Sequence, residues 1–260
     1  MSGIREGWSI QTRVIKALMI RELITRFGRE NIGFLWVMGE PLLFAGLVGL
    51  LWTFMKGPEE HGVGIVAFVA SGYIPLTFMR HSFSRCSSVF VANGSLLYHR
   101  QIKLIDFLFV RVLIEFIGAI MAWVFIALLL GYFGLFPMPH DLGMLVAGWM
   151  LYALFVLSVC TVIAPLSEVS ELVEKLMPVS VYIALPFSGT FTMVSWLKPS
   201  VRDVMLMSPM VNAVEMMRYG IFGNLVRPYY NIWNPLAVSM ILMIFGLALC
   251  RRIRRILVVE

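Results

Sequence analysis

The chain has 260 residues, of which 60% are hydrophobic and only 14% are charged, and its mean hydropathy is +0.86. A soluble domain is about 45 to 50% apolar and about 25% charged, so this chain lacks the polar surface that a water-exposed globule needs. The composition excludes a soluble domain, a disordered polymer and a coiled coil, and it predicts an all-α integral membrane protein.

Residues 1–31 are unlike the rest of the chain because they carry six basic side chains. Between Trp8 and Phe27, the apolar residues Ile10, Val14 and Leu18 recur at every fourth position while charged residues fill the other side. This pattern predicts an amphipathic helix on the inner leaflet of the membrane. The segment has no uninterrupted apolar core of the kind found in a cleavable signal peptide, so we expect the amino terminus to stay in the cytoplasm.

Six apolar segments follow, and each is longer than an ordinary soluble core helix. We therefore expect residues 32–260 to form a transmembrane domain of six helices. The segments run approximately over Ile32–Met55, Val63–Met79, Phe107–Leu130, Leu142–Ala164, Met177–Trp196 and Ile232–Cys250.

The basic residues assign an orientation to these segments. Fifteen of the 21 Lys and Arg residues lie in the amino-terminal segment, between Arg80 and Arg111, or in the carboxy-terminal tail. Because cytoplasmic loops retain Lys and Arg, these parts are expected inside, the loops near Lys56 and His140 outside, and both termini in the cytoplasm. The loop 167–175 is mainly acidic, but acidic residues contribute little to this rule, so we also expect it inside.

The net charge of +6 is therefore explained by topology. Nucleic acid is not an expected partner, since no basic stripe is interleaved with stacking aromatic residues. The three cysteines are widely spaced and show no C-x-x-C pairing. Their pattern argues against both a disulfide framework and a zinc site.

The stretch 197–231 precedes the last segment and is too apolar for a solvated loop. Pro199, Pro209 and Pro228 interrupt it too often for a crossing helix, so it predicts a pair of short re-entrant helices on the external side. Irregular backbone at membrane depth is stable only where it is buried in protein or lines a cavity, which points to a transport path. Glu215 and Arg218 lie three positions apart in this stretch and are expected to pair at an external gate.

Motifs for catalysis and nucleotide binding are absent from the sequence. There is no H-E-x-x-H, no G-x-S-x-G around Ser188 and no G-x-x-x-x-G-K-[ST], and the four histidines are scattered. The chain is therefore expected to be a transport subunit rather than an enzyme, with its energy supplied by another subunit. A lipid-modifying membrane enzyme and a passive channel are the alternatives, but neither a polar catalytic cluster nor a repeated filter motif is found.

Acidic residues inside the apolar segments are the other candidates for function. Glu40, beside Pro41, lies about 12 Å along the first segment at 1.5 Å per residue. An acid at that depth costs about 2.5 to 3.5 kcal/mol unless it finds a partner or water, so it is expected to face the protein interior. Either a helix-packing role or a conduit role fits it. Arg111 and Glu115, four positions apart, are expected to form a local pair.

Several stretches of the sequence together resemble type-2 ATP-binding-cassette (ABC) exporter permeases along nearly the whole chain. An Arg-Phe-Gly run combined with Glu40-Pro41 is most similar to the branch that exports capsular polysaccharide, since relatives exporting O-antigen or teichoic acid tend to have another residue before that proline. The matching stretches are 17–29 with Leu35-Trp36 and Glu40-Pro41; NGSLLYHRQIKLID at 93–106 with Arg111 and Glu115; 186–189 near Trp196; and 208–220.

This resemblance implies a multi-pass inner-membrane permease that works with a second copy of itself and with two copies of a cytoplasmic ABC ATPase. ATP and Mg would be bound by that ATPase, with no cofactor on this chain. The cargo would be a lipid-linked acidic polysaccharide, passed on to periplasmic and outer-membrane export proteins. A permease of the same type for O-antigen, teichoic acid or another lipid-linked cargo is the alternative within the family.

The resemblance also implies residue roles. It places ATPase docking in a cytoplasmic loop at about residues 80–106 and on the adjoining amino-terminal helix, at Arg21, Glu22, Arg26, Asn93, Leu96, Leu97, Tyr98, His99, Arg100 and Gln101. A conduit between two copies needs weak, repeated contacts with a sugar chain. Its expected wall residues are Trp36, Glu40, Trp52 and Tyr182 in the first and fifth segments, with Arg26, Arg29 and Arg100 at the entrance.

Overall fold

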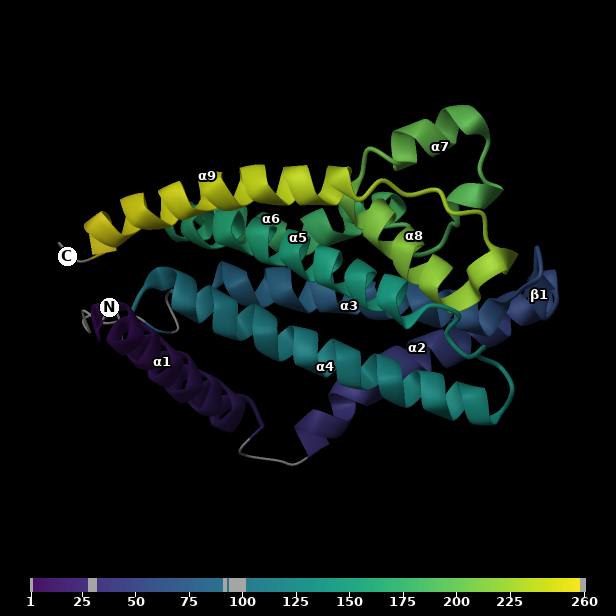
Figure 1. Cartoon of the computed structure of the whole chain (residues 1–260), viewed down its shortest axis with the longest axis horizontal. Coiled ribbons are helices and arrows are strands. Elements are labelled where there is room, and N and C mark those ends of the chain that lie inside the picture. Colours follow the sequence, from purple (N-terminus) through teal and green to yellow (C-terminus); the bar gives the residue numbers. More distant parts are fainter. Residues whose placement is uncertain (1, 28–31, 91–92, 94–101, 258–260) are drawn as a thin grey trace.

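The computed structural model describes residues 2–27, 32–90, 93 and 102–257, and these form an elongated bundle of helices (Figure 1). Four long helices, α3, α4, α5 and α9, run along the long axis, and both termini lie at the same end (Figure 1). The helices are α1 (Ser2–Phe27), α2 (Ile32–Lys56), α3 (Ile65–Ser87), α4 (Leu104–Tyr132), α5 (Leu142–Val169), α6 (Glu171–Ala184), α7 (Pro199–Met205), α8 (Pro209–Phe222) and α9 (Trp233–Leu257).

Short elements connect the helices at the end far from the termini. The strands β1 (Glu59–Glu60) and β2 (Val63–Gly64) form an antiparallel hairpin between α2 and α3. Three 3₁₀ turns, η2 (Leu185–Phe187), η3 (Val194–Trp196) and η4 (Gly223–Leu225), lie between α6 and α9. We call this end of the molecule, with the hairpin and α7, the distal end (Figure 1).

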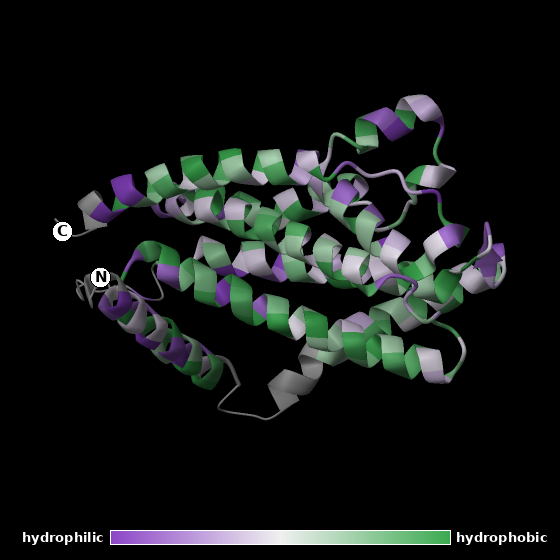
Figure 2. Cartoon of the chain, viewed as in Figure 1, coloured by the Kyte–Doolittle hydropathy of each residue, from purple (hydrophilic) through white to green (hydrophobic). Residues whose placement is uncertain are grey.

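Four helices within the described part of the chain are long and apolar enough to cross a membrane. They contain the spans Met38–Lys56, Leu104–Tyr132, Leu142–Val169 and Trp233–Arg254. Apolar residues dominate α4, α5 and α9, whereas hydrophilic residues gather on α1 and at the hairpin (Figure 2). The predicted fold class, an all-α membrane protein, is therefore confirmed. The helices α3 and α6 are not among the four: α3 is less apolar, and α6 has only 14 residues.

The structure corrects the boundaries of two predicted segments. The segment expected over 177–196 is instead the helix α6, which begins at Glu171 and ends at Ala184. Pro186 follows directly, and Gly189 adopts a positive φ of 71°, so the chain turns away from the helix there. The loop expected over 167–175 is reduced to Ser170, the single residue between α5 and α6. Its acidic residues therefore belong to helix ends.

The loop expected over residues 80–106 is also shorter than predicted. Helix α3 continues to Ser87, which makes Arg80 and Arg85 helical residues, and α4 begins at Leu104. The start of α4 is fixed by Asp106, whose carboxylate accepts a hydrogen bond of 2.9 Å from the backbone N–H of Lys103. A side chain in this position satisfies a backbone donor that the first helical turn leaves unpaired.

Helix α1 is amphipathic, as the sequence predicts, but its apolar stripe contacts protein. Leu18 is buried in the main core, and Val14 packs against that core from the same side. The carboxylate of Asp106 on α4 accepts a hydrogen bond from the side-chain amide of Gln11. On other sides of α1, Trp8 and Ile24 are exposed, so part of the helix surface remains available to lipid.

Helix α5 lies at the centre of the bundle and contacts α8 and α9 along its length. At Gly148 the backbone of α5 comes so close to α8 that an added Cβ would lie 2.9 Å from the backbone nitrogen of Met217. Aromatic rings fill the neighbouring space, with Trp149 and Tyr152 of α5 both near Phe78 of α3. This half of the bundle is thus held by close apolar packing.

Candidate functional site

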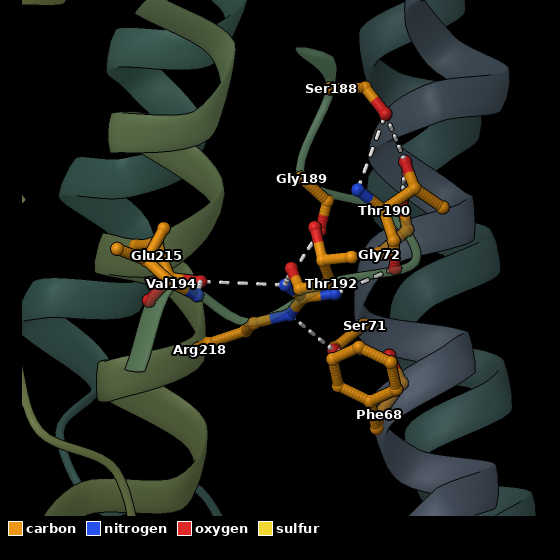
Figure 3. A network of polar contacts seen from close by, with 10 residues as sticks. All are labelled: Phe68, Ser71, Gly72, Ser188, Gly189, Thr190, Thr192, Val194, Glu215 and Arg218. Carbon is orange, nitrogen blue, oxygen red and sulfur yellow. Dashed lines mark hydrogen bonds and ion pairs between the residues drawn. The ribbon is translucent and has the colours of Figure 1, made fainter. Parts of the chain in front are cut away.

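Arg218 on α8 is the centre of a buried polar network near the distal end (Figure 3). Its side chain is 0% exposed. Its guanidinium donates hydrogen bonds to three backbone carbonyls, those of Gly189 at 2.7 Å, Thr192 at 2.9 Å and Thr190 at 2.8 Å. A buried cation is stable only when its donors are satisfied, and here the backbone of the segment after η2 satisfies them.

Helix α3 forms the other side of this network. The guanidinium of Arg218 lies 4.3 Å from the centre of the Phe68 ring, in a cation–π contact, and its Nε donates to the Ser71 hydroxyl at 3.4 Å. Gly72 allows this approach, because an added Cβ would lie 2.5 Å from the carbonyl oxygen of Thr190. The Arg218 network therefore ties α8, α3 and residues 188–194 together (Figure 3).

Glu215 balances the buried charge of Arg218. Its Oε1 lies 3.5 Å from Nη1 of Arg218 and accepts a hydrogen bond of 3.1 Å from the backbone N–H of Val194. Its other oxygen, Oε2, is buried without a hydrogen-bond partner in the described part of the chain. The pairing expected from the spacing of these two residues is present, and its side chains face the protein interior.

An aromatic group lies beside this network at the distal end. Trp52 of α2 is half-buried, with its ring 6.4 Å from that of Phe68 and 6.1 Å from that of Phe191. The Trp196 ring is 4.7 Å from the Phe68 ring and 5.3 Å from the exposed ring of His61. Segments from α2, the hairpin, α3 and the η2–η3 region therefore bring ring faces together. Rings of this kind offer flat apolar surfaces with weak polar edges.

A second set of polar contacts lies toward the other end of the bundle and begins at Glu40. This carboxylate on α2 forms an ion pair with Arg80 on α3, and its Oε2 lies 3.5 Å from Nε2 of His81. The side chain of Glu40 is 23% exposed. The prediction that Glu40 needs a partner and faces the protein is confirmed, and its partners come from the neighbouring helix α3.

The contacts continue from α3 to α4. Glu115 is 4% exposed, and its carboxylate lies 2.7 Å from Nε of Arg85 and 3.7 Å from Nδ1 of His81. His81 therefore lies between two carboxylates that belong to α2 and α4. Arg111, four residues before Glu115, donates to the backbone carbonyl of Arg85 and pairs with Glu22 of α1 at 3.2 Å. These contacts of Arg111 and Glu115 join separate helices, whereas the spacing predicted that the two residues pair with each other; that local pairing stays a prediction.

Two of the predicted docking residues contact each other at this end. The guanidinium of Arg21 on α1 donates a hydrogen bond of 2.8 Å to the side-chain oxygen of Asn93, which is buried. The amide of Asn93 in turn donates to the carbonyl of Val89 at 2.7 Å. Helix α1 is therefore attached to the chain at the start of the stretch between α3 and α4.

The structure describes some of the remaining predicted conduit and docking residues, and others lie outside its described part. Tyr182 on α6 is 65% exposed. Trp36 lies on α2, but its side chain and that of Arg26 are outside the described part of the structure, as are Arg29, Leu96, Leu97, Tyr98, His99, Arg100 and Gln101 altogether. Sequence reasoning missed Arg80, His81 and Arg85, because α3 was expected to end at Met79. Their signal was a run of basic residues at four- and five-residue spacing directly after an apolar segment.

These arrangements offer binding and positioning rather than covalent chemistry. Among the described residues, no three His, Cys, Asp or Glu side chains come together as metal ligands do. The cysteines Cys86, Cys160 and Cys250 are buried and free. The charged groups around Glu40 and Glu115 are held in interhelical pairs, and aromatic rings gather around Trp52 and Phe68, which suits a chain that moves or guides another molecule.

Comparison with known proteins defines the family. The model of the ABC-2 type transporter family matches residues 13–222. The chain is 38% identical over 244 residues to the capsule polysaccharide export inner-membrane protein CtrC of Neisseria meningitidis serogroup B, covering 94% of this chain and 92% of CtrC. It is 33% identical over 247 residues to the capsule polysaccharide export inner-membrane protein BexB of Haemophilus influenzae, covering 95% and 93% of the two chains.

A more distant similarity extends over the same length. The polysialic acid transport protein KpsM of Escherichia coli is 23% identical over 252 residues, which cover 95% of this chain and 96% of KpsM. The chain therefore belongs to the ABC-2 type transporter family, and it is a membrane transport subunit rather than an enzyme.

Proposed function

We propose that this chain is the permease subunit of an ABC exporter that moves a lipid-linked capsular polysaccharide across the inner membrane. The observation that carries the proposal is the similarity to CtrC, which extends along 94% of the chain. The composition supports it, since a chain without a nucleotide-binding motif needs a separate ATPase. ATP and Mg are bound by that partner.

In the proposed topology, α2, α3, α4, α5, α6 and α9 cross the membrane and both termini are cytoplasmic. The two termini lie at one end of the bundle (Figure 1), as an even number of crossings requires. Helices α7 and α8 form the external re-entrant pair, which the proline at the start of each helix and the burial of α8 support. The distal end is then the periplasmic end.

Docking of two ATPase copies onto two copies of this chain is proposed to involve α1 and the stretch between α3 and α4. The contact between Arg21 and Asn93 supports this, because it fastens α1 to the beginning of that stretch. Force applied there by the ATPase would reach both elements at once. Periplasmic and outer-membrane export proteins would receive the polysaccharide at the distal end.

The conduit is proposed to run between two copies, along α2 and α6. Trp52 supports this, since it lies half-buried on α2 in the aromatic group at the distal end, and a sugar ring stacks well on such faces. Tyr182 is exposed on α6. Lys56 lies 4.7 Å from the Trp52 ring and adds a cation for an acidic sugar. Arg26, Arg29 and Arg100 are proposed for the cytoplasmic entrance.

Export in cells tests this function with the substitutions Glu40→Ala and Tyr98→Ala. Each variant should be present in the membrane at a normal level and should lower the amount of capsule at the cell surface. Ile244→Ala is a suitable control, because that α9 side chain is 67% exposed and apolar and α9 lies outside the proposed conduit and docking site. Normal capsule export by both variants would contradict the conduit and docking assignments. Recovery of a stable, functional complex without any ATPase would contradict the ABC exporter itself.

A further inference from the structure

A chain of ionisable side chains crosses four helices toward the cytoplasmic end of the proposed permease. We call it the ionic chain, and it consists of Glu22 (α1), Arg111 and Glu115 (α4), Arg80, His81 and Arg85 (α3), and Glu40 (α2). We propose that the ionic chain transmits the movement of α1, where the ATPase docks, to α2, which forms the wall of the conduit. This inference rests on the proposed function and identifies the residues that couple the two subunits.

The contacts are continuous from one end to the other. Glu22 pairs with Arg111 at 3.2 Å, and Arg111 donates to the backbone carbonyl of Arg85. The side chain of Arg85 pairs with Glu115 at 2.7 Å, and His81 lies 3.7 Å from Glu115 and 3.5 Å from Glu40. Each of these steps passes to another helix.

Burial makes these contacts costly to break, so that they can hold the helices together when one of them moves. Glu115 is 4% exposed and Arg111 is 11% exposed. Removing one partner of a buried ion pair destabilises a protein, because the other charge is left buried and unpaired. Separating α4 from α1 or α3 would have the same effect on these charges. The helices are therefore expected to move together when α1 is displaced.

Helix α2 is the helix to which the ionic chain would transmit this movement. Its charged contact is made by Glu40, in the half of α2 nearer the termini. The distal half of α2 has an exposed apolar surface that includes Leu47 and Phe54 and faces lipid or a partner. The opposite part of the bundle is held differently, since α5 and α8 are joined by close apolar packing around Gly148. Helix α1 is thus connected to α2 by polar contacts, whereas the helices around α5 are held by apolar packing. A displacement of α1 can therefore reach α2 through the polar contacts.

The substitution Glu115→Gln tests this coupling, because it keeps the shape of the side chain and removes its charge. In a purified complex with the ATPase, in lipid vesicles, we expect normal assembly and continued ATP hydrolysis. The amount of polysaccharide exported per ATP hydrolysed should fall by roughly 5- to 150-fold, which is the fold-change that typical coupling free energies between two sites produce. Glu171→Gln is the matched control, since Glu171 forms an exposed pair with Lys175 at 3.1 Å outside the ionic chain. It should change neither quantity.

His81→Leu is the second variant, in case the loss of a buried charge prevents Glu115→Gln from folding. The side chain of His81 is 29% exposed and lies between Glu115 and Glu40, so its loss should uncouple export without unfolding the protein. Unchanged export per ATP hydrolysed in either variant would overturn the inference. An equal fall in ATP hydrolysis and export would overturn it as well, because it would indicate a structural or docking defect rather than lost coupling.

Spin labels give a readout that does not depend on activity. Cysteines introduced at Phe54 on α2 and Ile241 on α9 would be accessible, since these side chains are 87% and 67% exposed, whereas the three native cysteines are buried. A non-hydrolysable ATP analogue should change the label separation in the wild-type complex but not in Glu115→Gln. The same change in both proteins would contradict the ionic chain as the link. If the wild-type complex fails to form or to export, the proposed function itself is wrong.

Discussion

Glu215 and Arg218 face each other across 3.5 Å on one turn of α8, and neither side chain is more than 1% exposed. The guanidinium of Arg218 is directed at backbone carbonyls of the segment after η2 rather than at open space (Figure 3). If this region gates the external end, the pair acts by holding that segment in place. The gate surface itself is then formed by the side chains of that segment, including Phe191 beside Trp52.

Arg218→Met should destabilise the protein, since it leaves three carbonyls without donors and Glu215 without its cation. The expected loss is about 3 to 5 kcal/mol of unfolding free energy, as for other broken buried pairs. Thermal melting of the purified protein measures it. Arg227→Met at an exposed position is the control and should change stability by no more than about 0.5 kcal/mol. Equal melting temperatures for the two variants would contradict the structural role of Arg218.

Gly72→Ala should separate α3 from the segment after η2. The new Cβ would lie 2.5 Å from the Thr190 carbonyl oxygen and 2.7 Å from Nη2 of Arg218, so backbone or guanidinium must shift. We expect a lower melting temperature and less protein in the membrane. Gly46→Ala on α2 meets nothing within 4 Å and should be neutral or slightly stabilising, because Ala is the better helix former by about 1 kcal/mol. A harmless Gly72→Ala would show that the close approach is not required.

Asn93→Ala should weaken attachment of the ATPase. It removes the acceptor for Arg21 and thus the fastening of α1 to the proposed docking stretch. Loss of one such hydrogen bond to a charged group costs about 1.5 to 3 kcal/mol of free energy. If the whole loss falls on the binding of the ATPase, the complex becomes more than tenfold weaker. Copurification with the ATPase at varied concentration measures this. Asn224→Ala, exposed at the distal end, should bind the ATPase normally.

Trp52→Ala should lower polysaccharide export while leaving ATPase binding intact. The substitution removes a ring that contacts Phe68 and Phe191, and with it the stacking surface proposed for sugar. Phe245→Ala is the control, because Phe245 on α9 is 55% exposed and lies outside the proposed conduit. Export at the same rate by the two variants would argue against a conduit along this part of α2.

Much of the fold follows from the sequence, because apolar length and charge placement are strong signals in a membrane protein. The segment expected from Phe107 to Leu130 is α4, and the expected amphipathic start is α1. The continuation of α3 beyond Met79 could not be predicted from hydropathy, since Arg80 and Arg85 look like a loop until their partners Glu40 and Glu115 are known. Tertiary ion pairs decide that boundary.

The site was less predictable than the fold. The spacing of Glu215 and Arg218 indicated their contact, but nothing local indicated that Arg218 binds carbonyls some 26 to 29 residues earlier in the chain. Glu40 was singled out by its depth and by its place before Pro41, while its partner Arg80 lies 40 residues away. Contacts of this kind depend on which helices are neighbours, and a single sequence does not contain that information.

The 14 residues of α6 extend about 21 Å at 1.5 Å per residue, well short of a hydrocarbon layer of about 30 Å. Lipid beside so short a helix must thin, or polar groups of the helix ends must enter the apolar layer. Under the proposed function, α6 would give the permease a thin edge. A polar headgroup that passes along this edge with its sugar chain outside the lipid would have a shorter apolar barrier to cross than beside the longer helices α4, α5 and α9.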